Sequence, residues 1–161
     1  MDKDDLKRLK LVRLKDEIDA LDVPTLRRFL FEFVKEPCAY AIGRFSDCGF
    51  IEDLNSAAKA YASGKIEKSV LLSEIDVFLQ KIVTIEDEYD RKVLHSIASA
   101  YLALTDRAHA FDAIRHDLDA IVIDVGVEES LAIIPLRIDH HIETINKVRQ
   151  NNEKLVWLKT S

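Results

Sequence analysis

Apolar residues recur at intervals of three or four positions along most of the chain, which is the spacing of one face of an α-helix. The first such stripe consists of Leu11, Leu14, Ile18 and Leu21. Charged residues fill most of the positions around it. The stripe predicts an amphipathic helix over about residues 3–21, and it is too short for a stable coiled coil. We expect this N-terminal segment, residues 1–22, to pack on the rest of the domain.

Proline and glycine predict where further helices begin and end. Pro24 suits the first turn of a second helix, where its missing N–H is not needed. Pro37 predicts the end of that helix near residues 36–37, because the residue before a proline is pushed out of the helical region. Gly64 is a natural residue to follow a helix C-terminus. Further stripes predict three more helices, over about residues 38–47, 50–63 and 66–82.

A long helical pattern then covers residues 87–124, and we expect it to break near Thr105 and Asp106, since either side chain can cap a new helix. Residues 120–127 (AIVIDVGV) are rich in β-branched side chains, which leaves a strand as the alternative there. Pro135 either kinks the helix that follows or opens the last one.

The chain as a whole is expected to be all-α: a single domain over residues 1–161, built as a multi-helix bundle or a short helical array of about seven to eight helices. Its 161 residues are 48% apolar and 32% charged, as in ordinary globular domains. The charged N-terminus does not resemble a signal peptide, and no stretch is long and apolar enough for a membrane span. We therefore expect a cytoplasmic protein with no membrane partner.

The charge is acidic and unevenly distributed. The net charge is −6, residues 44–90 hold five bases against ten acids, and residues 106–129 hold two bases against seven acids. Nucleic-acid-binding proteins usually carry a basic face, so no nucleic-acid partner is expected. A basic protein is the partner that this balance favours, although acidity also serves solubility alone. Cys38 and Cys48 are expected to be reduced thiols.

Two groups of acids are the candidate partner-binding residues. The first is Glu86, Asp87, Glu88 and Asp90, at a predicted helix N-terminus. The helix dipole favours acids there without any function, but the same group would also attract a basic partner. The second group is Asp112 and Asp119, on one face of the following helix.

Asp112 and Asp119 belong to a stripe with His109 and His116, at spacings of three and four residues. Imidazole and carboxylate groups one turn apart can bind zinc, so His109, Asp112 and His116 are weak metal candidates. One helix rarely supplies all the ligands, and His140 or His141 would have to complete the set. A solvated polar face is the simpler interpretation, and no metal is expected. His141 lies beside an apolar stripe, which favours a hydrogen-bonded histidine at the boundary of the core.

The motifs of nucleotide-binding, zinc-protease, esterase and calcium sites are all missing from the sequence. No catalytic residue and no cofactor are predicted, and an enzyme is not expected.

The segment of residues 38–66 is similar to part of a known protein family. CAYAIGRF followed by SAAKAYASGKI resembles the helix–linker–helix opening of an all-helical family of immunity proteins from bacterial polymorphic-toxin systems. The matching positions are Cys38, Ala39, Ala57, Ala58, Tyr61, Ala62, Gly64, Lys65 and Ile66. Residues 96–114 are similar to the small-residue helix pair of that family. The resemblance implies an inhibitor that binds a cognate toxin.

The sequence therefore favours a non-catalytic protein-binding protein, most concretely a toxin-neutralising immunity protein that binds a basic toxin domain through acidic helices. The alternative is a structural or regulatory helical module that self-associates, for example as a homodimer. A small metal-dependent hydrolase that uses the His109–Asp119 stripe is the third hypothesis.

Overall fold

The computed structural model describes the backbone of residues 2–160 and the side chains of residues 2–151. This part of the chain forms seven α-helices, one short 3-10 helix and no strand, which confirms the all-α prediction. The elements are α1 (Lys3–Asp19), α2 (Val23–Arg44), α3 (Gly49–Ala62), α4 (Lys68–Val83), α5 (Glu88–Ala103), η1 (Arg107–His109), α6 (Ala110–Val125) and α7 (Val127–Thr160).

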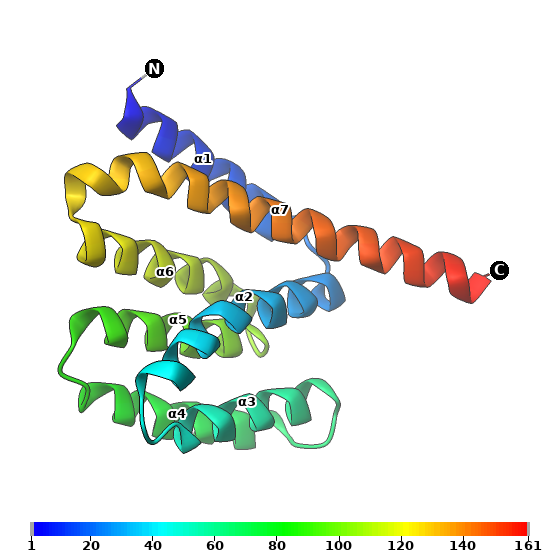
Figure 1. The fold of residues 1–161 in the computed structure, drawn as a ribbon. Helices are drawn as coiled ribbons and strands as arrows, with labels where there is room; N and C mark the ends of the chain where they lie inside the picture. The colour runs from blue at the N-terminus through cyan, green and yellow to red at the C-terminus, as the bar shows by residue number, and fades with distance from the viewer. Residues whose placement is uncertain (1, 161) are drawn as a thin grey trace.

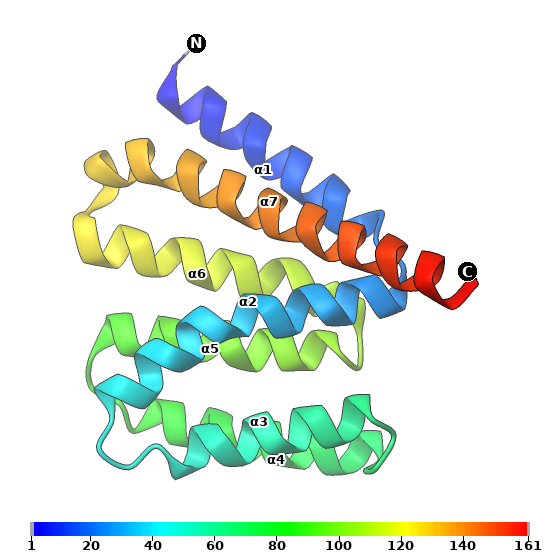
Figure 2. The ribbon, with the colours of Figure 1, turned by 45° about the vertical axis from the view of Figure 1, so that its right-hand side comes forward.

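Most of the helices form a stack, and one crosses it. In Figures 1 and 2, α1, α7, α6 and α5 follow one another from the top of the view downward, and α3 and α4 form a pair below them. Helix α2 packs across this stack and contacts both α5 and α7. The buried side chains form one continuous core that all seven helices share.

The N-terminal helix lies along α7. It buries Leu14 and Ile18, and ion pairs from Lys10 to Asp139 and from Glu17 to Arg149, each 2.6 Å long, join the two helices. The chain then turns into α2.

Helix α2 begins as predicted, and the Oδ1 of Asp22 caps it by accepting a hydrogen bond from the backbone N–H of Thr25 (3.0 Å). The predicted helix end at residues 36–37 is wrong, because α2 continues through Pro37 to Arg44. The reason is tertiary packing. Phe33, Pro37 and Ala41 lie on one buried face of α2, and burying this face offsets the backbone hydrogen bond that proline cannot make.

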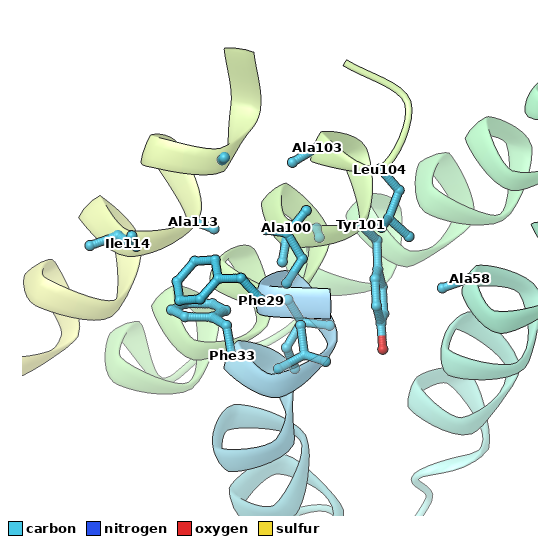
Figure 3. Close-up of a cluster of buried hydrophobic side chains, with 14 of the residues drawn as sticks. Phe29, Phe33, Ala58, Ala100, Tyr101, Ala103, Leu104, Ala113 and Ile114 are labelled. Atoms are coloured by element: carbon cyan, nitrogen blue, oxygen red, sulfur yellow. The ribbon is translucent and has the colours of Figure 1, made fainter. Parts of the chain in front are cut away.

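The long pattern of residues 87–124 breaks where the sequence predicts. Asp106 Oδ1 accepts a hydrogen bond from the N–H of Ala108 (3.1 Å), which starts η1 and then α6. Alanines let α5 and α6 pack closely as an antiparallel pair. Figure 3 shows Phe29 and Phe33 of α2 beside Ala100 and Ala113, while Tyr101 points to the other side of α5, toward α3.

Two alternatives left open by the sequence are settled by the backbone. Residues 120–125 are helical, so the strand alternative is wrong. Gly126 ends α6 with a φ of 89°, a left-handed value that suits glycine. Helix α7 then runs through Pro135, so this proline does not open a new helix. Ile134, Ile138 and Ile145 keep one buried face across that position.

Candidate functional site

The predicted His109–Asp119 stripe is divided in the structure. His109 lies at the start of α6, where its Nδ1 is 3.8 Å from Asp112 Oδ2. Asp119 lies 3.5 Å from the Nζ of Lys92 on α5. Within the described residues, no three histidine, cysteine or acidic side chains come together in a group that could hold a metal ion.

His116 is the member of the stripe that the sequence places wrongly. The four residues do not form one solvated face, because α5 packs close enough for the ring of His95 to stack on that of His116, with 5.3 Å between centroids. Burial and the charge of Lys92 lower the pKa of both imidazoles. The pair is therefore neutral at pH 7 and belongs to the α5–α6 interface.

The predicted acidic cluster at the start of α5 is only partly exposed. Glu86, Asp87 and Glu88 are exposed, but Asp90 is 2% exposed and is not available to a partner. Its Oδ1 accepts a hydrogen bond from the Tyr40 hydroxyl (2.7 Å), and its Oδ2 lies 3.1 Å from Arg44 Nε. Both partners come from the part of α2 after Pro37, which the sequence assigned to a separate helix.

The fold brings further acids beside the three exposed ones. The connection from α4 to α5 and the turn from α6 to α7 lie at the same end of the molecule, on the left of Figures 1 and 2. We call the exposed carboxylates at this end the acidic end: Glu86, Asp87, Glu88, Asp124, Glu128 and Glu129. No ion pair among the described residues engages any of them. Asp112 and Asp119 do not belong to it, since each has a neighbouring base.

An ion network that was not predicted from the sequence joins α2, α6 and α7, and its members range from the buried His141 to the exposed Glu36. Asp117 of α6 accepts hydrogen bonds from Arg137 Nε (2.9 Å) and Nη2 (3.0 Å). The Nη1 of Arg137 donates to both oxygens of Glu36 on α2, at 3.1 and 2.9 Å. The Nε2 of His141 lies 2.8 Å from Asp117 Oδ2. We call Glu36, Asp117, Arg137 and His141 the ion network.

Electrostatics fix the protonation of this network. Burial raises the pKa of Asp117, but the hydrogen bonds from His141 and Arg137 outweigh it and bring the value down to about 2. Burial lowers the pKa of His141, so we assign a neutral imidazole that donates its Nε2–H to an ionised Asp117. The prediction that His141 is a hydrogen-bonded histidine is confirmed. It is, however, fully buried, with its ring 5.3 Å from that of Phe33.

One signal in the sequence pointed to this network. Arg137 and His141 are four residues apart, so they share a helix face, and that face also carries Ile134, Ile138 and Ile145. An arginine beside a buried stripe requires a buried acid nearby. Which acid supplies it depends on how α6 and α2 pack.

A cavity of about 230 Å³ adjoins the ion network, between α2, α5, α6 and α7. Its polar lining residues are Glu36, Tyr40, Tyr89, Ser96, Asp117 and Arg137, and we call it the tyrosine pocket. The rings of Tyr40 and Tyr89 meet edge to face, with 5.4 Å between centroids. Burial and the neighbouring Asp90 raise the pKa of Tyr40 to about 12, so its hydroxyl stays protonated.

His141 is buried too deeply to act as a general base. His141 resembles half of a catalytic dyad with Asp117, but its side chain is 3% exposed, and its ring packs on Phe33. A general base must reach the proton that it removes, and this imidazole has no open approach.

Comparisons with protein-family models, with curated proteins and with solved structures found no match to this chain. None of the described helices is long and apolar enough to cross a membrane.

Proposed function

We propose that this protein is a non-catalytic binding protein, most concretely an immunity protein that neutralises a toxin, and that it binds a basic partner through the acidic end. The observation that carries the proposal is the placement of six exposed carboxylates, from α5, α6, α7 and their connections, at one end of the molecule. The resemblance at residues 38–66 supports the more specific form.

The physical effect of such a surface is mainly on the association rate. Several negative charges on one face attract a basic partner over about one Debye length, roughly 10 Å at 0.1 M salt. Charges at the rim of an interface act on the rate of encounter more than on the lifetime of the complex. Binding should therefore weaken steeply as salt is added.

The test is growth rescue. The protein encoded next to this chain's gene is expressed in bacteria, with and without this chain. If that neighbour is toxic, co-expression of this chain should restore growth. The triple variant Glu86→Lys, Glu88→Lys and Glu128→Lys should lose most of the rescue and should slow association in vitro.

The matched control changes the net charge by the same amount elsewhere. Asp5, Asp53 and Asp76 are exposed on α1, α3 and α4, and none takes part in a described ion pair. Replacing all three with lysine should leave rescue and association near the wild-type values. Equal effects of the two triple variants would contradict binding through the acidic end. No rescue by the wild-type chain would contradict the toxin-neutralising function.

A second candidate function, self-association, rests on a different observation. Helix α1 exposes Leu6, Leu9 and Val12, which are 37%, 56% and 60% accessible. An apolar strip of this kind is typical of a contact surface. Sedimentation velocity of the wild-type protein and of a Leu9→Ser, Val12→Ser variant tests it, because a dimer held by α1 would dissociate in the variant.

A further inference from the structure

The tyrosine pocket lies beside the acidic end and reaches the surface. Tyr89 immediately follows Glu88 in α5, and Asp124 is close enough to act on the pKa of its phenol. On α2, Tyr40 is 38% exposed, and the side chain of Glu36 is 63% exposed. A group carried by a partner bound at the acidic end can therefore enter the pocket from solvent.

The charge of the pocket selects a cation. Arg137 is the base among its lining residues, and its N–H groups already donate to Asp117 and Glu36. These two carboxylates outnumber the single guanidinium, and Asp124 adds a third negative charge nearby. After burial, Asp124 and Asp117 are the main causes of the raised pKa of Tyr89, and they outweigh Arg137 there. An anion would meet repulsion in this pocket, and a cation would be attracted.

The aromatic walls favour a flat cation. The Tyr40 hydroxyl is held by Asp90, which fixes one ring, and the second ring stands edge-on against it. The Tyr89 hydroxyl makes no hydrogen bond to another described residue, so its oxygen is free to accept one. A guanidinium stacks on aromatic rings and offers several donors in one plane, which a lysine ammonium does not.

We propose that the tyrosine pocket receives the guanidinium group of an arginine side chain from the partner, packed on Tyr40 and Tyr89 and hydrogen-bonded to Glu36. This inference rests on the proposed function, since the partner is the basic protein bound at the acidic end. It adds a defined anchor to an otherwise diffuse electrostatic surface.

The test uses the arginine group by itself. N-acetyl-arginine methylamide is titrated into the ¹⁵N-labelled protein, and amide shifts are followed by NMR. We expect saturable shifts at residues 36, 40, 89 and 117. The neutral isostere N-acetyl-citrulline methylamide should cause no saturable shift at these amides, because it lacks the charge.

Matched tyrosine variants separate the pocket from general effects. Tyr89→Ala should weaken binding of the arginine compound about fivefold, the equivalent of about 1 kcal/mol for one cation–π contact. Tyr61→Ala is the control, because Tyr61 is also half-buried but lies at the end of α3, where it contacts Arg27. The amide spectrum away from α5 reports whether each variant is folded. If Tyr89→Ala does not fold, Tyr89→Leu keeps the bulk of the side chain and removes the aromatic ring.

The outcomes distinguish this inference from the proposed function. No shifts at the pocket, or equal shifts with the citrulline compound, would overturn the guanidinium site even if the chain rescues growth. Shifts that persist unchanged in the folded Tyr89 variant would also overturn it. Arginine binding at the pocket together with failed growth rescue would support the guanidinium site and reject the toxin as its source.

Discussion

Replacement of Asp117 with asparagine should cost the fold about 3 kcal/mol, because it removes the charge that pairs α6 with Arg137 and His141 of α7. The Asp117 carboxylate accepts two hydrogen bonds from Arg137 and one from His141. An asparagine has nearly the same shape but only one oxygen, so Arg137 would keep Glu36 as its charged partner and lose the other.

Two independent routes give a similar magnitude. The pKa of Asp117 is lowered from 3.8 to about 2, which corresponds to about 2 kcal/mol of stabilisation of the folded state at neutral pH. Removing one partner of a buried ion pair typically costs about 3–5 kcal/mol, since the other charge stays buried without compensation. Because Arg137 keeps its contact with the largely exposed Glu36, we expect a loss of stability of about 3 kcal/mol, the lower end of this range.

Urea unfolding followed by circular dichroism measures this loss, and Asp119→Asn is the matched control on the same helix. Asp119 is more than half exposed and lies 3.5 Å from Lys92, so its replacement should cost less than about 1 kcal/mol. The wild-type protein should also lose stability as the pH falls from 3.8 toward 2, because the lowered pKa stabilises the fold only while Asp117 is ionised. Asp117→Asn should lack that part of the pH dependence. If the two variants unfold at the same urea concentration, the ion network does not stabilise the fold.

Two further predictions concern stability. The folded state lowers the pKa of both His95 and His116 below the ordinary 6.5. The free energy of unfolding should therefore fall as the pH drops below about 6.5. In urea titrations at pH 7.5 and 5.5, His116→Gln should reduce the difference in unfolding free energy between the two pH values. Gly126→Ala should destabilise the protein by about 1–2 kcal/mol, because alanine is strained at the φ of 89° found there. Gly43→Ala lies inside α2 with open space around it and should stabilise the protein by about 0.5 kcal/mol. Melting temperatures that shift in the same direction for both variants would contradict this pair of predictions.

The sequence predicted the helices well because their main signals are local. Apolar residues at helical spacing and side-chain caps such as those of Asp22 and Asp106 depend on neighbours within about one turn. The wrong prediction at Pro37 has the opposite origin. A local rule ended the helix, while the packing of α2 on α5 and α7 carried it on.

The candidate site depends on contacts between distant parts of the chain, which periodicity does not reveal. Asp117 and Arg137 are 20 residues apart in the sequence, and Glu36 is 101 residues from Arg137. The same holds for Asp90, whose partner Tyr40 is 50 residues away. The sequence does not distinguish an acidic residue that is paired in the core from one that is exposed at the surface. It could therefore locate the acids but could not assign either role to them.

That separation changes which acids are available to a partner. Residues 106–129 contain seven acids, yet four of them are engaged within the fold. These are Asp106 as a helix cap, Asp112 beside His109, Asp117 in the ion network and Asp119 beside Lys92. The three that remain, Asp124, Glu128 and Glu129, all lie at the acidic end. Counting charge by segment therefore overstates how much acid a partner meets and says nothing of where it lies. Asp87 also caps α5, but the other five carboxylates of the acidic end take part in no described ion pair or helix cap, so charge reversal at Glu86, Glu88 and Glu128 should alter binding while the free energy of unfolding stays nearly constant.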